Sequence, residues 1–378
     1  MKRSSIRKKT VVADVCAAME TIAPTALAQE WDNVGLLAGD LQAAVRRVLL
    51  TIDLTGPVVD EALRKKFDLL VSYHPPIFKP IRSLCAPGSG MEALVYRCIR
   101  KGVAIYSPHT ALDAAEGGTN DALARLCGIY QSDPLEYVDS PTTDHCKFVV
   151  FVPPQHVEDV ATAVFEAGAG QIGDYSRCSF RTPGEGTFLG GKDANPAVGR
   201  RGRMESVKEV RLESIVRTTD LPKVIHAMRE AHPYEEPAFD IYPLKPGPVR
   251  GIGRCGKLPK TTTLEKLARR LQFQTKAKGV QMVGRREQAV DFVVIAAGAA
   301  GSLPFRIPLN DHHVIITGEI RHHDALTIGR YGCSAIALGH WAGERPVLKL
   351  LAHRLAELLP GIFLTVSAAD RDPFDSLG

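Results

Sequence analysis

Short apolar runs alternate with amphipathic stretches through the first third of the chain. Three runs are rich in the aliphatic residues of buried strands, and four stretches repeat apolar residues with the 3.6-residue period of helices. The expected strands are Arg47–Asp53, Phe67–Tyr73 and Val103–Tyr106, and the expected helices are Val11–Ile22, Val58–Lys66, Met91–Arg100 and Asn120–Cys127. This alternation predicts a sheet with crossover helices on its faces.

A different order of elements begins after Pro141. A strand and a helix are followed by glycine-rich hairpin material, a second strand, a second helix and a last strand. These segments are Lys147–Val152, Val157–Ala167, Gly168–Gly199, Val210–Val216, Leu221–Ala231 and Phe239–Leu244. The β-α-β-β-α-β order is that of a ferredoxin-like module, and Pro243–Pro248 is its expected exit linker.

The α/β alternation resumes at Arg254 and continues to the end of the chain. The expected strands are Asp291–Ala297, His313–Thr317 and Ser334–Leu338, and the expected helices are Leu264–Leu271, Asp324–Tyr331 and Val347–Leu358. The sequence therefore predicts an α/β fold in which a composite domain, built from both chain halves, is interrupted by an inserted ferredoxin-like α+β module. We place the N-terminal half at 1–143, the insertion at 144–247 and the C-terminal half at 248–378.

The composition is that of an ordinary globular chain, with 45% apolar and 24% charged residues in 378. The longest apolar runs are too short to cross a bilayer, so we expect no membrane partner. The formal charge of +5 is modest for this length, and the basic run Arg200–Arg203 is narrower than a nucleic-acid-binding stripe. We therefore expect no nucleic-acid partner.

Cysteine usage and the N-terminus bear on the cellular compartment. Eight cysteines are scattered along the chain without a Cys-x-x-Cys pair, which favours a reduced, cytoplasmic protein over a disulfide scaffold or a zinc ribbon. The basic segment Met1–Lys9 lacks the apolar stretch of a secretory signal. We interpret it as a solvated tail, in preference to a short transit-type leader.

Histidines and carboxylates follow four of the apolar runs. They stand at His74, at His109 and Asp113, at Glu319–Asp324, and at His340 and Glu344. In open α/β sheets, ligands collect outside the carboxyl ends of the strands. Because imidazole and carboxylate donors gather there without a thiolate, we predict a site for divalent zinc, iron, manganese or nickel.

Two of these clusters share a His-x-x-x-carboxylate spacing. His340 and Glu344 would lie on one side of a helical first turn, where the glutamate could bridge two ions or bind one. The alternative is a helix N-terminal acid favoured by the helix dipole, with a locally hydrogen-bonded histidine. His109 and Asp113 repeat the spacing, although Asp113 taken alone also suits a helix N-cap.

The remaining candidates carry less specific signals. Tyr73, beside His74, could be a phenol ligand, a donor to a bound oxyanion or a packing residue, and we favour packing. Glu319 and His323 could act as a general acid or base beside a metal. The sequence contains no dinucleotide fingerprint, P-loop or Gly-x-Ser-x-Gly elbow, so neither a nucleotide cofactor nor a serine nucleophile is indicated.

Five segments, in order over nearly the whole chain, resemble the Nif-three-like dinuclear metal-centre family, whose members are often named GTP cyclohydrolase I type 2 homologues. They are Glu30–Asp40, Tyr73–Phe78, His109–Asp113, Thr317–Ala325 and Gly339–Glu344. The middle of the chain resembles the PII/CutA-like insertion of longer members, which implies a ferredoxin-like module. Its matching segments are Gly168–Ser176, Gly186–Phe188 and His232–Glu236.

The resemblance implies a ligand set and an assembly. The family's metal ligands fall on His74, Asp113, His340 and Glu344. By the same resemblance Glu344 bridges two ions, and His109 lies beside the site. The family's usual His-His-Pro is Tyr73-His74-Pro75 here, and a phenol is a much weaker donor unless it ionises near the metal, so we expect one or two divalent ions per subunit. Members are typically toroidal hexamers, which implies a homo-oligomeric ring.

The resemblance also implies an activity. The expected function is that of a metal-dependent hydrolase acting on a nucleotide or a phosphorylated heterocycle, with the metal lowering the pKa of the attacking water. The alternative is a non-enzymatic protein that handles metal or regulates a partner through the inserted module. A regulatory scaffold with a purely structural metal is the third hypothesis.

Overall fold

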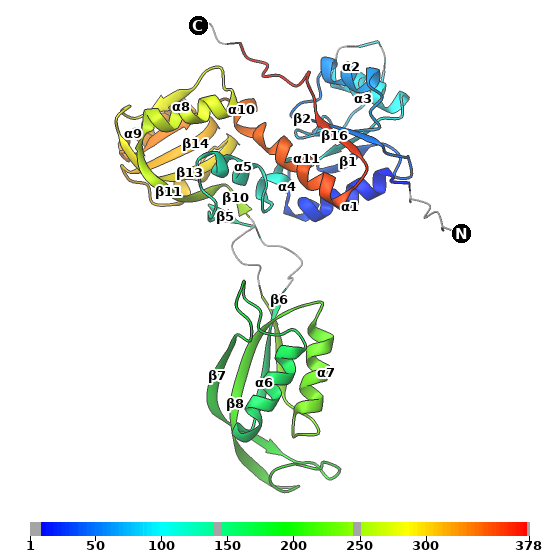
Figure 1. Ribbon diagram of the computed structural model, residues 1–378, viewed down its shortest axis with the longest axis vertical. Helices are drawn as coiled ribbons and strands as arrows, with labels where there is room; N and C mark the ends of the chain where they lie inside the picture. The colour runs from blue at the N-terminus through cyan, green and yellow to red at the C-terminus, as the bar shows by residue number, and fades with distance from the viewer. Residues whose placement is uncertain (1–8, 86, 89, 139–144, 245–250, 376–378) are drawn as a thin grey trace, which may run out of the picture. The chain divides into compact units, whose positions relative to one another are not determined.

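The computed structural model describes residues 9–85, 87–88, 90–138, 145–244 and 251–375 (Figure 1). The chain divides into two compact units, one formed by Met1–Val138 with Pro248–Gly378 and the other by Asp139–Gly247. The domain boundaries predicted at 143/144 and 247/248 lie outside the described residues, as do residues 1–8 of the basic tail and 245–248 of the exit linker. The exact boundaries therefore stay predictions.

The first sheet of the larger unit has the strand order β1-β4-β3-β2-β16. Its strands are β1 (Gly35–Ala38), β2 (Arg47–Thr51), β3 (Leu69–Ser72), β4 (Ala104–Ser107) and β16 (Phe363–Val366). β2, β3, β4 and β16 are parallel, and β1 runs antiparallel to β4 at one edge. Because β16 comes from the C-terminal end of the chain, both chain halves build this sheet, which confirms the composite α/β fold.

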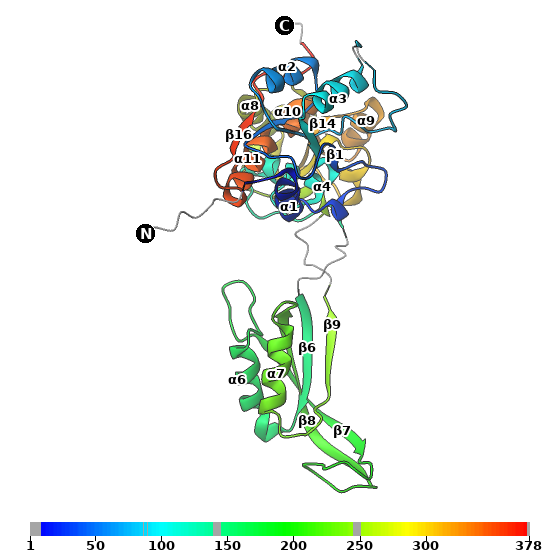
Figure 2. The same cartoon turned by 90° about the vertical axis from the view of Figure 1, so that its right-hand side faces the viewer.

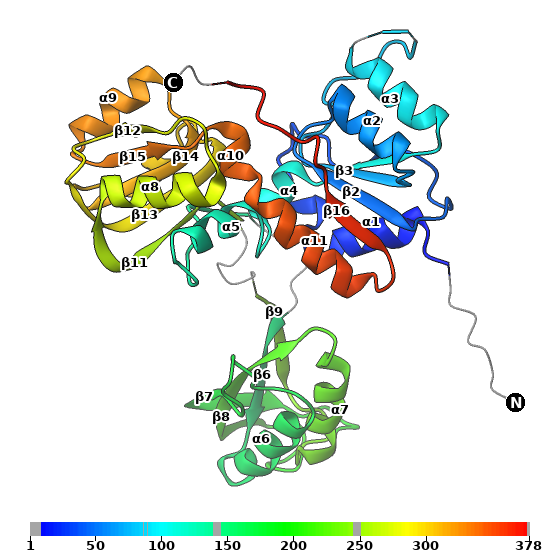
Figure 3. The same ribbon diagram turned by 45° about the horizontal axis from the view of Figure 1, so that its top comes forward.

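Helices cover both faces of the first sheet, as Figure 3 shows. Leu50 packs in one cluster with α1 (Val12–Ile22) and α11 (Pro346–Leu358), whereas Leu49 packs in another with α2 (Gly56–Arg64) and α3 (Met91–Arg100). Successive strand residues point to opposite faces, so a strand covered on both sides must be apolar throughout. The apolar runs that predicted β2, β3 and β4 have this origin.

The second sheet has the order β11-β13-β14-β15-β12. Its strands are β11 (Arg254–Thr263), β12 (Gln281–Val283), β13 (Ala289–Ala299), β14 (His313–Glu319) and β15 (Ser334–Ala337). The three central strands are parallel, and β11 and β12 are antiparallel edges. Helices α8 (Leu264–Thr275) and α9 (His322–Arg330) belong to this half, but α5 (Thr119–Leu126) arrives from the N-terminal half and packs its Leu123 in the same core as Leu267 and Val293.

A buried ion pair joins α5, which comes from the N-terminal half of the chain, to the second sheet. Arg254 of β11 is 1% exposed, and its Nε and Nη2 donate to the two carboxylate oxygens of Asp121 on α5 at 2.7 and 2.9 Å. A bidentate contact of this kind is directional as well as strong. It holds α5 against the second sheet in one orientation.

Short elements complete the larger unit. They are the helices α4 (His109–Ala114) and α10 (His340–Glu344), the 3-10 turns η1 (Thr25–Leu27) and η3 (Leu303–Arg306), and a two-stranded pair of β5 (Glu136–Tyr137) with β10 (Gly251–Ile252). α4 and α10 directly follow β4 and β15, and both carry candidate site residues.

The smaller unit is a four-stranded antiparallel sheet with two helices packed against it (Figure 2). Its elements are β6 (His145–Val152), η2 (Pro154–His156), α6 (Val157–Glu166), β7 (Ser179–Leu189), β8 (Met204–Arg217), α7 (Leu221–Ala231) and β9 (Phe239–Pro243). Phe148 and Leu212 of the sheet pack against Val160 of α6 and Val224 of α7. The strand order β7-β8-β6-β9 is that of a ferredoxin-like β-α-β-β-α-β module.

Several element bounds differ from the predicted ones. β8 begins at Met204 rather than Val210, because it pairs with β7 along an exposed hairpin in which Leu189 faces Met204. α8 continues to Thr275 beyond Leu271, and the Thr275 hydroxyl donates to the Leu271 carbonyl. Residues 204–209 are largely polar since this part of the hairpin has no core to cover, so the apolar pattern missed them.

Candidate metal centre

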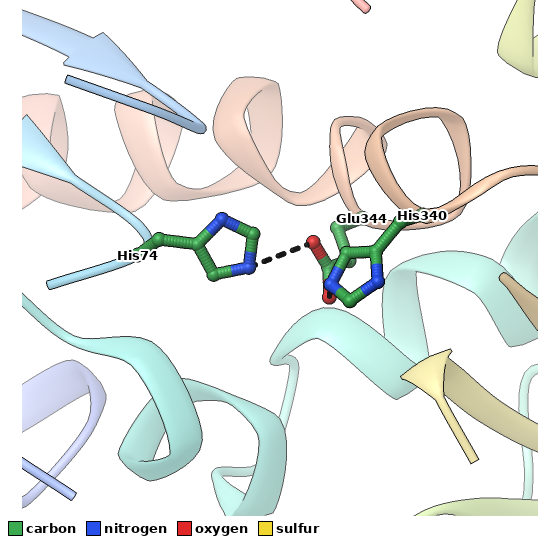
Figure 4. A group of neighbouring side chains, drawn as sticks. All are labelled: His74, His340 and Glu344. Carbon is green, nitrogen blue, oxygen red and sulfur yellow. Dashed lines mark ion pairs between the residues drawn. The ribbon is translucent and has the colours of Figure 1, made fainter. Parts of the chain in front are cut away.

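Three candidate ligands from two different sheets meet in the larger unit (Figure 4). His74 lies two residues beyond β3, where its backbone N–H still donates to the Ile52 carbonyl at 3.0 Å. His340 opens α10 and Glu344 ends it. Gly339 adopts a φ of +89° between β15 and α10, a conformation that glycine reaches without a side-chain penalty.

The ligand atoms of the three residues converge. Nε2 of His74 lies 3.3 Å from Oε2 of Glu344, and Nε2 of His340 lies 3.2 Å from Oε1 of the same carboxylate. One ligand atom from each residue falls within 4.8 Å of the other two. Two ligands about 2.1 Å from one tetrahedral ion are about 3.4 Å apart, so the observed spacings suit a single divalent ion. All eight cysteines are free thiols, and none of them belongs to this group of ligands.

Each imidazole is held by a carboxylate on its other nitrogen. Nδ1 of His74 lies 2.9 Å from Oδ1 of Asp53, and Nδ1 of His340 lies 2.8 Å from Oε1 of Glu319. A carboxylate at Nδ1 fixes the ring orientation and holds a proton there, so Nε2 is the nitrogen that would coordinate a metal once it has released its own proton. Both rings are therefore oriented as metal ligands before any ion binds.

The charges of the cluster shift its ionisation equilibria. Burial by itself lowers the pKa of His74, but hydrogen bonds to Asp53 and Glu344 outweigh it and raise the pKa to about 10. The hydrogen bond to Glu344 is the main cause that raises the pKa of His340 to about 9. Burial tends to raise the pKa of Glu344, yet contact with the two imidazoles lowers it below its usual value.

The carboxylate of Glu344 is only 4% exposed, and Oε2 meets no strict hydrogen-bond geometry among the described residues, its ion-pair contact being Nε2 of His74 at 3.3 Å. A buried carboxylate is costly unless a cation or donors compensate it. Gly298, with a φ of +66°, leaves the room beside it, since a Cβ there would come within 2.4 Å of Oε1. The buried carboxylate, the cleared space and the imidazole–carboxylate donor set fit a divalent ion.

Tyr73 and Asp113 form a pair next to this cluster. The Tyr73 hydroxyl donates to Oδ1 of Asp113 at 2.5 Å, and the Tyr73 side chain is 1% exposed within the core of the first sheet. Burial, and then the charge of Glu344, raise the pKa of Asp113 to about 6. Asp113 lies inside α4 and the N-cap of the next helix is Gly118, so the helix-capping alternative for Asp113 is wrong.

The other candidates occupy different places. The His109 ring centroid lies 5.3 Å from that of His74, and Asp32 accepts from its Nδ1 at 2.8 Å. Glu319 is linked to the three-ligand group by its hydrogen bond with Nδ1 of His340. His323 is exposed on α9, where its ring stacks edge-on near His322, so its catalytic role stays a prediction without support from proximity.

Comparison with known proteins identifies the family. Residues 10–373 match the sequence model of the family described as Duf34/NIF3 (NGG1p interacting factor 3). The chain belongs to the Duf34/NIF3 family. The resemblance found in the sequence motifs is thereby confirmed.

Relatives of the family align along most of the chain. A protein of Mycobacterium tuberculosis named GTP cyclohydrolase 1 type 2 homolog is 39% identical over 339 residues, which cover 89% of this chain and 88% of the relative. A Bacillus subtilis protein of the same name is 34% identical and covers 95% of this chain and 96% of its own. The crystal structure of a Bacillus cereus protein related to NIF3 superposes with a TM-score of 0.73 at 32% identity, covering 98% of this chain and 100% of that one.

The sequence analysis did not identify Asp53 as a site residue, and it named Glu319 as a possible general acid or base rather than as the carboxylate that positions His340. Asp53 follows β2 and Glu319 ends β14, and each precedes its histidine by 21 residues across a β-α-β unit. The predicted strand Arg47–Asp53 ends at Asp53, and Asp32 lies within the family motif Glu30–Asp40. A carboxylate at or just past the end of one parallel strand, with a histidine just past the end of the next, is the signal that could have assigned this positioning role to Asp53 and Glu319.

Proposed function

We propose that this Duf34/NIF3 protein binds a divalent ion through His74, His340 and Glu344 and hydrolyses a nucleotide or related phosphorylated heterocycle. The observation that carries the proposal is the buried Glu344 carboxylate between two imidazoles whose Nε2 atoms face it. An ion held by these residues would lower the pKa of a bound water and so supply a nucleophile at neutral pH. Asp53 and Glu319 hold the imidazole rings of His74 and His340 in place.

The donor set favours catalysis over a structural role for the metal. Structural zinc sites are closed by four protein ligands, whereas catalytic sites use three and keep a position open. Two imidazoles and one carboxylate make a three-ligand set, which suits zinc and also non-haem iron. Asp113, beside the cluster, is bonded to Tyr73 instead.

Exposed aromatic rings near the centre support a planar substrate. Trp31 is 61% exposed and Phe78 49% exposed, with ring centroids 6.0 Å apart. Trp31 also lies 6.1 Å from His109, whose ring is 5.3 Å from His74. Aromatic side chains that stay exposed beside a polar site are suited to stack on a heterocyclic base. The names of the relatives make GTP the first nucleotide to test.

A turnover assay on the full chain tests the hydrolase. The protein is loaded separately with zinc, iron, manganese or nickel and offered GTP and a panel of phosphorylated heterocycles. We expect turnover that requires metal and is lost, together with metal retention, in Glu344→Gln. Glu357→Gln, at an exposed glutamate on α11, is the matched control and keeps both properties. Metal-loaded protein that turns over nothing in the panel would overturn the hydrolase proposal.

The Tyr73–Asp113 contact favours one second candidate, a non-enzymatic protein that handles metal or regulates a partner. A two-metal clamp needs ligands for both ions, and Asp113 is engaged elsewhere. If the protein handles metal, the bound ion should transfer to a competing chelator or partner, and the metal-loaded protein should turn over no substrate of the same panel. Retention of the ion against both, combined with turnover, excludes it.

We further propose a cytoplasmic homo-oligomeric ring, with the PII/CutA-like module as the regulatory part. Family membership supports the ring, and the ferredoxin-like strand order supports the module. No helix in the described ranges combines the length and apolar character needed to cross a membrane. Light scattering coupled to size-exclusion chromatography is expected to give the mass of six subunits, and a monomer would overturn the ring.

A further inference from the structure

We infer that this chain holds one metal ion per subunit, and that the hydrogen bond between Tyr73 and Asp113 takes the place of a second ion. The inference rests on the proposed metal site of His74, His340 and Glu344. It assigns to Tyr73 the role of setting the number of ions bound.

The inference begins from two neighbouring carboxylates, those of Glu344 and Asp113. Glu344 is 4% exposed, and Asp113 is close enough that the negative charge of Glu344 acts on it. Two neighbouring acids in a protected site need compensation by cations or by hydrogen-bond donors. The imidazoles and one ion compensate Glu344, whereas Asp113 receives the phenolic hydrogen of Tyr73 at 2.5 Å. A second cation has no uncompensated carboxylate left to bind.

The donor atoms near Asp113 are also unsuitable for a second ion. The Tyr73 oxygen offers a divalent ion a neutral hydroxyl that is already donating its hydrogen, and imidazole is the better ligand for zinc, iron or nickel. Asp113 does not belong to the group of ligand atoms that lie within 4.8 Å of one another. The geometry therefore gathers ligands for one ion.

Packing keeps Tyr73 in this position. Its side chain is 1% exposed, and its ring stands edge-on to His74 and His109 with centroids 5.0 and 5.6 Å away. Its backbone N–H donates to the Thr51 carbonyl at 2.9 Å, which continues the pairing with β2. Rotating the ring away from Asp113 would require opening the core, so the hydroxyl cannot simply swing aside when metal is added.

Metal counting on the full-length protein tests the inference. Wild type, Tyr73→His and Tyr73→Phe are saturated with zinc, freed of loosely bound ions on a desalting column and measured by plasma mass spectrometry. We expect one ion per subunit in wild type and two in Tyr73→His, because histidine frees Asp113 and adds an imidazole. Tyr73→Phe frees Asp113 without adding a ligand, so it stays at one.

The outcomes separate this inference from the metal site on which it rests. Two ions in wild type would overturn the inference and leave the proposed function standing. Wild type that retains no ion, or an ion content that Glu344→Gln does not lower, would overturn the proposed function itself. If Tyr73→His does not fold, electron paramagnetic resonance of manganese-loaded wild type decides. Isolated ions with resolved hyperfine structure support one ion, and a spin-coupled pair contradicts it.

Discussion

Glu319 precedes His340 by 21 residues, and its Oε1 lies 2.8 Å from Nδ1 of that histidine. The same arrangement recurs in the other sheet, where Asp53 precedes His74 by 21 residues. In both cases the carboxylate lies at or just past the end of one parallel strand and the histidine follows its neighbour, β2 with β3 and β14 with β15. Two β-α-β units therefore each deliver one pre-oriented imidazole to Glu344.

The anchoring carboxylates are expected to set metal affinity. Replacing Asp53 or Glu319 by its amide leaves side-chain volume unchanged but removes the negative partner of the Nδ1 proton. Loss of such a partner typically weakens metal binding roughly 10–100-fold. Titration against a chromophoric chelator measures the change. Asp60→Asn, at a largely exposed carboxylate paired with Arg97, is the control, and equal affinity in all three variants would contradict the anchoring role.

Gly298→Ala tests the space beside Glu344. The new Cβ would lie 2.4 Å from Oε1, so the carboxylate must shift from the position in which it contacts His340. We expect loss of metal binding together with about 1 kcal/mol or more of destabilisation from the positive φ of +66°. Gly301→Ala shares the strain, with a φ of +55°, but meets nothing within 4 Å. Chemical denaturation and metal titration of both variants separate backbone strain, which they share, from metal loss, which only Gly298→Ala should suffer.

Trp31→Ala tests the stacking surface of the proposed hydrolase. Stacking of one base on an aromatic side chain contributes about 1–3 kcal/mol, so KM for a nucleotide should rise roughly 5-fold or more while kcat changes little. Phe273→Ala, at an 85% exposed ring on α8, controls for loss of exposed aromatic surface. Steady-state kinetics give both constants. A fall in kcat at constant KM would place Trp31 outside substrate binding.

The central strands were predictable because both of their faces are buried. β2, β3, β4, β13, β14 and β15 are carried by uninterrupted apolar runs. The edge strands β11 and β12 were missed for the opposite reason. β11 contains Pro259 and a register irregularity between Lys257 and Thr262, features that edges tolerate and that weaken a strand pattern. β16 was missed because a strand of four residues is too short for the alternation of apolar and polar residues to be recognised.

Local sequence patterns reveal the candidate site only at single strand ends, whereas the resemblance to the Nif-three-like family grouped His74, Asp113, His340 and Glu344 as ligands. His74, His340 and Glu344 follow apolar runs, and a histidine and a carboxylate four residues apart share a helix face. Their convergence depends on how two sheets pack, which no local pattern encodes. The same limit hid the contact of Tyr73 with Asp113, since the hydroxyl and carboxylate belong to residues 40 positions apart.

The Glu61 carboxylate is expected to make the free energy of unfolding depend on pH. Its side chain is 4% exposed on α2 and accepts from Lys65 at 2.6 Å, from the Ser367 hydroxyl at 2.6 Å and from the Ala369 N–H at 3.0 Å. Burial tends to raise the pKa of this carboxyl, but these donors outweigh it and lower the pKa from 4.5 to about 2. The ionised form therefore ties the C-terminal segment after β16 to α2.

The sign of the effect follows from the lowered pKa. Since the folded state holds the ionised carboxylate more tightly than the unfolded state, Glu61 stabilises the fold above about pH 4.5, and this contribution disappears as the pH falls towards 2. The shift corresponds to about 3 kcal/mol. Denaturation at pH 7 and at pH 3 should give a stability gap between wild type and Glu61→Gln that narrows in acid. Glu357→Gln supplies the baseline, and a gap that stays constant with pH would show that Glu61 acts through shape rather than charge.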